Sequence, residues 1–435
     1  MTIPYLPNTD AGRRAMLDAV GVAGVDDLFA DIPAQFRNPR LDLPPALSEL
    51  ELRRNLQRSA SRDANTAGDS VFLGGGAYNH FIPSVVWALA RRGEFATSYT
   101  PYQPELAQGN LQATYEFQSL VCQLLGMDVA NAGMYDGASA AAEAALMACR
   151  ITGRHAVAVL STVNPRYLDV IRTYATPQGV AVAVVEPGQP PPPISACLIA
   201  QSPNFLGYLE PMADLARLAH NSSALLVAIT DPISLGLFRP PGEYDADIAV
   251  AEGQPLGVPL SFGGPYVGLF ACKQAHLRQM PGRVVGKTVD GQGRTGYVLT
   301  LQTREQHIRR ERATSNICTS ETLVAIACAI YLAAMGRHGL REVAELCYHK
   351  AHYAAARIAQ LPGFSLPIQG TFFKEFVVRC PRAPQMINRA LLEQGIMGGL
   401  DLGARLPNAM LLCVTEMHSK AEIDALVEGL RKASK

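Results

Sequence analysis

Three polar positions lie where apolar runs end or where a helix begins, which is where a ligand could bind. The turn at 135–139 leads into an alanine-rich segment, Asp231 directly follows the run Leu225–Thr230, and Gln254 follows the run Asp247–Ala251. In open α/β sheets, ligands bind at the carboxyl ends of the strands. We therefore expect one shared site, formed by Gly137, Ser139, Asp231 and Gln254.

The first two positions each have an ordinary alternative. A glycine turn with a hydroxyl at a helix start can cradle a phosphate, but Gly137 and Ser139 also fit a simple helix N-terminus. Asp231 could hold a pyridinium nitrogen in its protonated form, or the pair Asp231-Pro232 could cap a turn. The three features follow one another along the chain: the turn with Gly137 and Ser139, the strand that ends before Asp231, and the strand that ends before Gln254. This order is a more specific signal than any one of the three features. It predicts a fold of the pyridoxal type.

The elements that must position these residues form a regular pattern in the middle of the chain. Short apolar runs alternate with helical patterns, such as those at Pro165–Thr176 and Pro211–His220. Such runs indicate a mainly parallel sheet that is covered on both faces. The predicted strands are Ala156–Leu160, Val180–Val185, Ala196–Gln201, Leu225–Thr230, Asp247–Ala251 and Tyr266–Ala271.

The chain divides into three predicted parts. Residues 1–60 form a helical arm, which includes amphipathic patterns at Met16–Phe29 and Pro44–Arg58 and is too small to bury a core. Residues 61–320 form the large α/β domain, and residues 321–435 form a smaller α+β domain with a strand candidate at Phe372–Cys380. The predicted fold class is therefore α/β. The order of the site elements, together with the resemblance given below, implies the pyridoxal-phosphate-dependent aminotransferase-like type (fold type I).

Composition excludes several classes of function. The 435 residues are 48% hydrophobic and 17% charged, with a formal net charge of zero, so no global field favours nucleic acid or an anionic membrane. No uninterrupted apolar run reaches the ~18 residues that a membrane span needs. The nine cysteines are scattered without a CxxC pair, so we expect a cytoplasmic protein. His349 and His352 share a helix face but lack a third ligand, so no metal is expected.

Long motifs carry a resemblance that covers nearly the whole chain. The chain is similar to the N-terminal, or α, subunit of the two-subunit bacterial glycine decarboxylase, the P-protein of the glycine cleavage system. The motifs are Phe72-Leu73-Gly74-Gly75-Gly76-Ala77-Tyr78-Asn79-His80-Phe81-Ile82-Pro83, Tyr99–Glu105, Gly109–Gln112, Met134–Gly137 and Thr303–Thr319. Within the last motif, Arg312 stands where the family pattern leads us to expect lysine.

The resemblance implies that this chain lacks the nucleophile of its own site. The stretch from Glu252 to Pro265 resembles the His-Lys-Thr segment whose lysine forms a Schiff base with pyridoxal phosphate, and Gln254 stands in place of that lysine. Amine catalysis needs a nucleophilic ε-amino group, whereas an amide lone pair is delocalised into the carbonyl. In the family, the β subunit binds pyridoxal phosphate covalently, so no catalytic residue and no covalent cofactor are expected here.

The implied activity is that of an αβ glycine dehydrogenase (aminomethyl-transferring, decarboxylating), inactive as this chain alone. Glycine loses its carboxylate as carbon dioxide, and the aminomethyl group passes to the lipoyl arm of H-protein. The partners are the β subunit, lipoylated H-protein and glycine. Loop residues rich in phenols, hydroxyls and amides are candidates for the shared site or interface, together with one arginine: Tyr78, Asn79, His80, Ser98, Tyr99, Thr100, Tyr102, Gln103 and Arg294.

Alternatives stay open for these groups. The loops could instead pack a subunit interface without touching a ligand. The basic run from Arg304 to Arg312 could attract an acidic partner, or it could form internal ion pairs with Glu305 and Glu311 on a solvated helix. Two rival functions also remain: a non-catalytic scaffold, and a self-sufficient pyridoxal enzyme that uses Lys287 or, less suitably placed, Lys273.

Overall fold

The computed structural model describes residues 8–64, 68–317 and 320–434. The chain forms two units, Met1–Asp63 and Ala64–Lys435. The last two residues of the Thr303–Thr319 motif, Cys318 and Thr319, lie outside the described residues. The predicted limits of the large and small domains stay a prediction.

The first unit is an arm of short helices without a core. Its elements are α1 (Asp10–Val20), η1 (Val25–Phe29), η2 (Ala34–Phe36) and α2 (Glu49–Ala60), and none of their residues is buried. The helix expected over Met16–Phe29 is divided, because α1 ends at Gly21 in the left-handed conformation. Helix α2 begins with a capping box in which the Ser48 and Glu51 side chains accept each other's backbone N–H groups.

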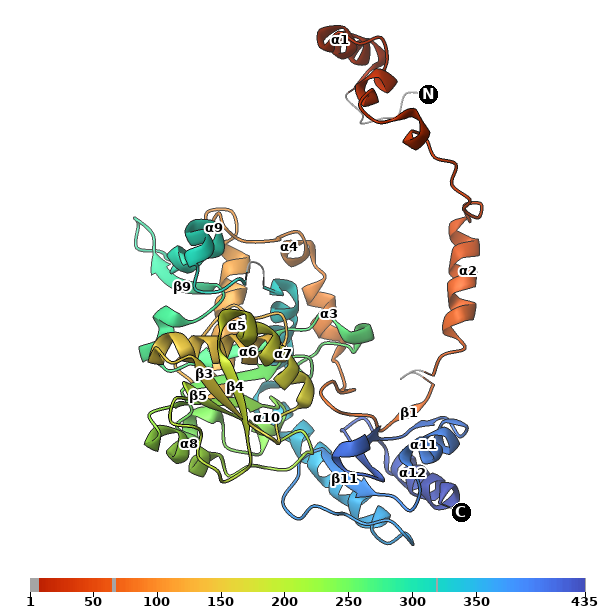
Figure 1. Ribbon diagram of the computed structural model, residues 1–435, viewed down its shortest axis with the longest axis vertical. Helices are drawn as coiled ribbons and strands as arrows, with labels where there is room; N and C mark the ends of the chain where they lie inside the picture. Colours follow the sequence, from red (N-terminus) through yellow and green to blue (C-terminus); the bar gives the residue numbers. More distant parts are fainter. Residues whose placement is uncertain (1–7, 65–67, 318–319, 435) are drawn as a thin grey trace. The chain divides into compact units, whose positions relative to one another are not determined.

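The second unit contains a seven-stranded sheet in the order β2-β8-β7-β6-β5-β3-β4. Figure 1 labels its strands β3, β4 and β5. The neighbouring pairs from β4 to β7 are parallel, whereas β8 runs antiparallel to β7 and β2 antiparallel to β8. The expected mainly parallel sheet is confirmed. The strands are β2 (Val129–Ala130), β3 (Ala156–Leu160), β4 (Ala181–Val185), β5 (Cys197–Ser202), β6 (Leu225–Thr230), β7 (Ile248–Glu252) and β8 (Gly268–Cys272).

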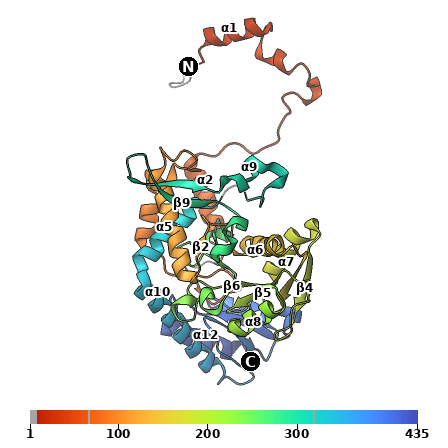
Figure 2. The ribbon, with the colours of Figure 1, turned by 90° about the vertical axis from the view of Figure 1, so that its left-hand side faces the viewer.

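Both faces of the sheet are covered because strand side chains alternate. In β7, Ile248 and Val250 pack in a core with α6 (Gly137–Thr152), whereas Ala249 and Ala251 pack in a second core with α5 (Gln108–Leu125) and α10 (Thr322–Ile358). Figure 2 shows α5 and α10 on one side of the strands and α6 on the other. The sheet edge that carries the predicted site is therefore held rigidly between two helical layers.

Further helices and a two-stranded ribbon complete this part. The helices are α3 (Ser84–Ala90), α4 (Gly93–Ala96), α7 (Pro165–Ala175), α8 (Met212–Asn221) and α9 (Gln306–Arg309), and the ribbon pairs β9 (Val284–Val289) with β10 (Thr295–Thr300). Short 3-10 turns on either side of α9 replace the continuous helix expected for the basic run.

Helix α10 links the sheet to the C-terminal elements. Among the described residues it is long and apolar enough, by length and composition, to cross a membrane. Its first half packs in the core beside α5, and residues such as Ala351 and Ile358 pack in the core of the C-terminal part, which accounts for its apolar character. The helix is broken at Gly336, whose backbone is not helical.

The C-terminal elements form a small antiparallel sheet in the order β11-β14-β13, with α11 and α12 packed together. Phe72 packs in the same core, and the strand β1 just before it pairs with β12. The elements are β1 (Ser70–Val71), β11 (Glu375–Arg379), α11 (Pro384–Leu392), β12 (Ile396–Met397), β13 (Leu400–Asp401), β14 (Ala409–Cys413) and α12 (Lys420–Ala433).

Candidate functional site

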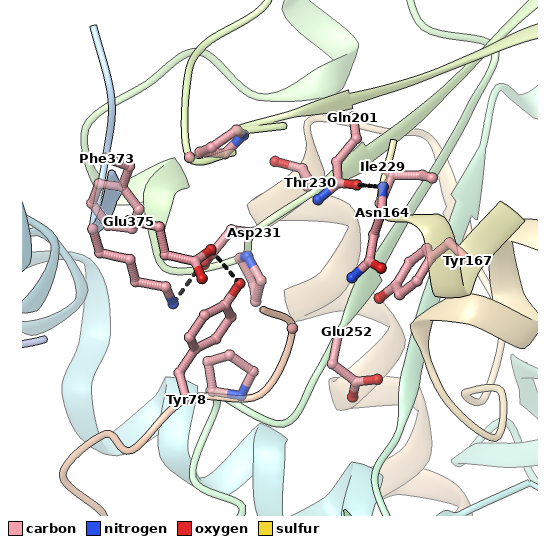
Figure 3. Close-up of a pocket in the computed structure, with 16 residues that line it drawn as sticks. Tyr78, Asn164, Tyr167, Gln201, Ile229, Thr230, Asp231, Glu252, Phe373 and Glu375 are labelled. Atoms are coloured by element: carbon pink, nitrogen blue, oxygen red, sulfur yellow. Dashed lines mark hydrogen bonds and ion pairs between the residues drawn. The ribbon is translucent and has the colours of Figure 1, made fainter. Parts of the chain in front are cut away.

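The carboxyl ends of β6 and β7 bring the predicted site residues together. Thr230 pairs with Ala251, so Asp231 and the segment after β7 leave the sheet at the same edge. Figure 3 shows Asp231, Tyr78 and Glu375 around a pocket, with Glu252 and Tyr167 at its other end. The cavity holds about 40 Å³, far below the ~300–1,000 Å³ typical of small-molecule sites.

Gln254 is buried and all the hydrogen-bonding groups of its amide are satisfied. Its Oε1 accepts the Tyr78 N–H at 2.9 Å, and its Nε2 donates to the Tyr78 carbonyl at 2.9 Å and to the Val258 carbonyl at 2.8 Å. The side chain thus fastens the 74–80 loop to the turn after β7. A residue at the expected lysine position has become a structural clamp.

Asp231 both caps a turn and binds a cation. Its Oδ1 accepts the Ile233 N–H at 2.9 Å, and its Oδ2 lies 2.6 Å from Nζ of Lys374. Both side chains are nearly buried, at 11% and 2% exposure. Burial opposes the ammonium charge, but the carboxylate of Asp231 raises the pKa of Lys374 above its usual value. The lysine therefore stays charged.

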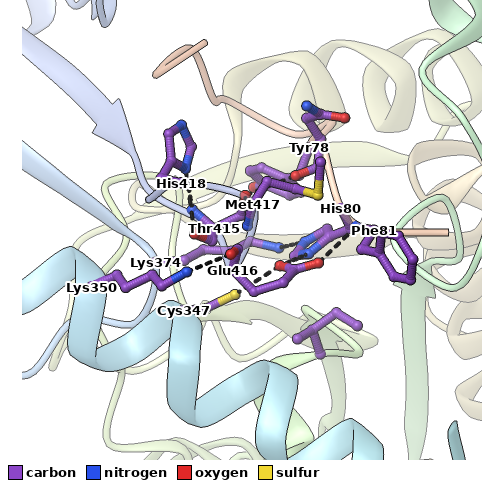
Figure 4. A network of polar contacts seen from close by, with 12 residues as sticks. Tyr78, His80, Phe81, Cys347, Lys350, Lys374, Thr415, Glu416, Met417 and His418 are labelled. Carbon is purple, nitrogen blue, oxygen red and sulfur yellow. Dashed lines mark hydrogen bonds and ion pairs between the residues drawn. The ribbon is translucent and has the colours of Figure 1, made fainter. Parts of the chain in front are cut away.

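The ammonium of Lys374 also joins a buried polar network (Figure 4). It lies 3.6 Å from the centre of the Tyr78 ring, a cation–π contact, and 3.0 Å from Nε2 of His80. Because the ammonium can only donate, Nε2 of His80 accepts, and its Nδ1–H donates to Glu416 at 2.7 Å. Burial and the charge of Lys374 lower the pKa of His80, so the ring is neutral.

Three side chains of this network could in principle bind a metal. His80, Cys347 and Glu416 place their ligand atoms within 4.8 Å of one another. However, the positive charge of Lys374 beside His80 opposes a second cation. Burial alone would raise the pKa of Glu416, but the hydrogen bonds from His80 and from the Phe81 N–H lower it to about 2. We assign the cluster as a hydrogen-bond network.

Glu375 completes the polar lining on the side of the C-terminal sheet. It is the first residue of β11, and its Oε1 accepts the Gly75 N–H at 2.7 Å while its Oε2 accepts the Tyr78 hydroxyl at 2.7 Å. Burial raises the pKa of Glu375 to about 7. The carboxyl group therefore carries a proton in a substantial fraction of molecules at neutral pH.

The N-terminus of α6, the expected phosphate cradle, is satisfied by acids of the chain itself. Asp136 accepts the Ser139 N–H at 2.7 Å, as an ordinary N-cap. Glu252 accepts the Gly137 N–H at 2.9 Å and the Gln254 N–H at 3.0 Å. Burial raises the pKa of Glu252 to about 8. Gly137 is needed here because a Cβ would meet the Tyr167 hydroxyl and the backbone of Glu252.

These contacts do not fit pyridoxal phosphate. The carboxylate that would pair with its ring nitrogen holds Lys374, the helix N-terminus that would hold its phosphate holds Glu252, and the position that would bind it covalently is an amide. A wider cavity of about 820 Å³ adjoins this pocket and is lined by residues such as Tyr135, Asn79 and Tyr266. The deep part near Asp231 is filled by side chains of the chain itself.

The predicted interface residues separate into two groups. Tyr78 lines this chain's own pocket, His80 contacts Lys374 of the pocket lining, and Asn79 lines the wider cavity. The residues Ser98, Tyr99, Thr100, Tyr102 and Gln103 belong to a loop before α5, in which Tyr99 is 78% exposed. The hydroxyl of Tyr102 accepts a hydrogen bond from Arg283 at 2.9 Å, so this loop is held against the segment before β9.

The basic residues have local partners. Arg294 is exposed at the ribbon turn and pairs with Asp290 at 2.8 Å. Arg283 lies 3.6 Å from Glu305, and Arg304 donates to the carbonyl groups of Met280 and Gly282. These contacts support the alternative of internal interactions for Glu305 and Arg304.

Neither rival lysine lines the pocket. Lys287 is exposed on β9, opposite Tyr297. Lys273 follows β8, whose end pairs with the start of β7, so it lies at the opposite edge of the sheet from Gln254. It is 2.7 Å from carboxylate oxygens of both Asp245 and Asp247.

Sequence reasoning missed the side chains that close the pocket. Lys374 and Glu375 lie in the strand candidate Phe372–Cys380, and no role was predicted for the side chain of Glu252 at the strand end before Gln254. Two adjacent charges inside an apolar run were the available signal, because such charges are rarely buried without partners. Their partners are distant in sequence and could not be identified from spacing.

Comparison with known proteins shows the family of the chain. A family model described as glycine cleavage system P-protein matches residues 4–430. The probable glycine dehydrogenase (decarboxylating) subunit 1 of Thermomicrobium roseum is 51% identical, with 99% of each chain covered. The protein of the same description from Moorella thermoacetica is 50% identical, with 98% of this chain and 99% of that protein covered.

Solved structures with a similar fold show the structural class of the chain. Glutamate decarboxylase from Lactobacillus brevis shares the fold at a TM-score of 0.67 and 13% identity, with 91% of this chain and 94% of that chain covered. A crystal structure of glycine decarboxylase (P-protein) of the glycine cleavage system, in inhibitor-bound form, has a TM-score of 0.92 and 44% identity, with 99% and 100% covered. The chain therefore has the fold of pyridoxal-phosphate-dependent enzymes of fold type I. Within that class, it belongs to the glycine cleavage system P-protein family.

Proposed function

We propose that this chain is the first subunit of a two-subunit glycine dehydrogenase (decarboxylating) and is inactive alone. The observation that carries the proposal is Gln254, which stands at the position expected for lysine and is fully engaged in backbone hydrogen bonds. Relatives called subunit 1 match the chain over nearly its whole length. A second, lysine-bearing subunit would then bind pyridoxal phosphate covalently.

In this complex the chain contributes side chains that line the active site of the partner, and it contributes no nucleophile. Pyridoxal phosphate on the partner would provide the electron sink for decarboxylation of glycine. The phenol and hydroxyl groups of the 98–103 loop are suited to orient a small carboxylate or to line the entrance for the lipoyl arm of H-protein. The exposed side chains of its Tyr99 and Tyr102 support that role. For the compartment we propose the cytoplasm, supported by the free thiols of the eight cysteines that the structure describes.

Glycine–bicarbonate exchange tests the proposal. The chain alone, with pyridoxal phosphate, should give no exchange, and a mixture with the lysine-bearing subunit should be active. Exchange by the isolated chain would contradict the proposal. In that case the Lys287→Ala variant would show whether the exposed lysine of β9 is responsible.

A scaffold that never reaches the partner's site is the second candidate, favoured because Tyr78 lines this chain's own pocket and His80 contacts Lys374 of its lining. The Tyr102→Phe and Asn79→Ala variants distinguish the two in the reconstituted complex. Intact assembly with a large loss of turnover indicates a site role. Unchanged turnover in both variants indicates a scaffold.

A further inference from the structure

Two ionisable side chains, Lys374 and Glu252, occupy the two ends of the vestigial pocket. At one end, the ammonium of Lys374 contacts Asp231 at 2.6 Å and faces the Tyr78 ring at 3.6 Å. At the other end, a carboxyl oxygen of Glu252 accepts the Gly137 N–H at the start of α6. We propose that Lys374 and Glu252 are built-in substitutes for the pyridinium and phosphate ends of pyridoxal phosphate, and that they keep this pocket closed to it.

At the ring end, the buried carboxylate of Asp231 needs a partner of opposite charge. A buried carboxylate without a partner is strongly destabilising, so a chain that lost its cofactor would have to pair or replace Asp231. Lys374 provides that pair from the residue just before β11, and its ammonium is buried with the carboxylate. A pyridinium nitrogen entering here would meet a like charge, which costs several kcal/mol.

At the phosphate end, a side chain of the protein likewise takes the place of the cofactor. The first N–H groups of a helix have no partners within the helix and attract anions. At α6, Asp136 and Glu252 accept two of them, and Glu252 also accepts the Gln254 N–H. A phosphate would have to displace Glu252 and approach the carboxylate of Asp136.

The proposal has a consequence for restoring the nucleophile. Replacing the amide at position 254 by an amine leaves both ends of the pocket occupied. The variant Gln254→Lys alone should therefore remain unable to hold pyridoxal phosphate. Binding should appear only when Lys374 and Glu252 are also replaced.

The test measures pyridoxal phosphate binding to the purified chain by equilibrium dialysis. Borohydride reduction and peptide mass analysis then locate any pyridoxyl group. The variants are Q254K, Q254K/K374M/E252S and the control Q254K/K287M, which removes an exposed lysine of β9 instead. We expect the triple variant to bind at least about a hundredfold more tightly than Q254K and to be labelled at position 254, and the control to match Q254K.

Several outcomes would overturn the proposal. Stoichiometric labelling of Q254K at position 254, or labelling of Lys374 in the unmodified chain, would show that Lys374 does not exclude the cofactor. A folded triple variant that binds no better than Q254K would show that other features close the pocket. If the triple variant does not fold, Q254K/K374Q/E252Q keeps the volume and polarity of the site, and the same gain over Q254K is required of it. The readout is independent of turnover, so it stands apart from the proposed function.

Discussion

At the scale of single residues, this pocket shows how a cofactor site can lose its chemistry and keep its fold. Asp231 remains at the end of β6, but it holds Lys374. Gln254 remains at the end of β7, but its amide binds the backbone of Tyr78 and Val258. The polar groups of both side chains have protein partners, as burial requires. The stability of this region therefore rests on side chains that a cofactor would otherwise contact.

Gln254→Ala tests the clamp. The substitution leaves the partly buried N–H and carbonyl of Tyr78 and the buried carbonyl of Val258 without their amide partner. We expect the free energy of unfolding to fall by about 3 kcal/mol, since an unsatisfied buried group costs about 1–3 kcal/mol. Urea unfolding of the isolated chain measures this. Gln292→Ala, at an exposed glutamine of the ribbon turn, serves as the control and should change stability little.

Glu375→Gln tests the pH dependence that burial imposes. The folded chain raises the pKa of Glu375 from 4.5 to about 7, so it binds more protons than the unfolded chain between these values. The contribution of Glu375 to the free energy of unfolding is therefore fully present below about pH 4.5 and is lost as the pH rises through 7. The tyrosine Tyr78, the ammonium of Lys374 and the carboxylate of Asp231 face the group.

Glutamine at 375 can still accept the Gly75 N–H and can donate to the Tyr78 hydroxyl, so the variant should fold. When the pH rises from 5 to 8, the free energy of unfolding should fall in both proteins. The fall should be up to about 3 kcal/mol smaller in the variant than in the unmodified chain. Urea unfolding at several pH values gives the comparison. The variant Glu393→Gln, at an exposed position, should leave the pH dependence unchanged, and an unchanged slope in Glu375→Gln would contradict the assignment.

At the scale of elements, the sheet that positions the site followed directly from the sequence. The predicted strands Ala156–Leu160 and Leu225–Thr230 match β3 and β6, and the other four match within two residues. Buried parallel strands are continuous apolar runs, and that signal is local. The order of the strands fixes the edge at which Asp231 and Gln254 meet.

The parts of the fold and the site that the sequence did not predict depend on contacts between distant residues, which the spacing of residues along the chain does not encode. The ribbon of β9 and β10 was not predicted, because Gly286, Lys287 and Thr288 interrupt its apolar pattern. Lys374 was assigned to an ordinary strand because its partner Asp231 lies on a different part of the chain. The local pattern specified which residues are buried, whereas the long-range pairing specified what the pocket can bind.

Helix α10 contains a break that can be tested by itself. Gly336 has φ 59° and ψ −174°, a combination that is almost restricted to glycine. A Cβ at this position would meet no atom within 4 Å, so Gly336→Ala adds backbone strain and no clash. We expect a loss of about 1–3 kcal/mol in thermal or urea unfolding. Gly109→Ala, at a glycine near the start of α5 that also has open space, should be neutral.

At the scale of the whole molecule, we expect an exposed apolar side chain to contact the proposed partner subunit. Phe262 lies in the glycine-rich loop between β7 and β8, with its side chain fully exposed and φ at +57°. A bulky side chain in the left-handed region is strained, and exposing a phenylalanine forgoes about 1.5–3 kcal/mol of burial. The chain itself gains nothing from this arrangement, which supports a role in binding another chain.

Phe262→Asn separates association from folding. Asparagine tolerates the left-handed backbone, so the free energy of unfolding of the isolated chain should change by less than about 0.5 kcal/mol. Loss of the ring should weaken binding to the lysine-bearing subunit about tenfold or more, because buried aromatic anchors at interfaces contribute ~2 kcal/mol or more. Sedimentation or calorimetric titration of the two subunits measures the dissociation constant. Ile194→Asn, at another exposed apolar side chain, is the matched control and should bind normally. If Phe262→Asn also bound with unchanged affinity, the glycine-rich loop would lie outside the interface, and the exposed Tyr99 would be the next residue to test.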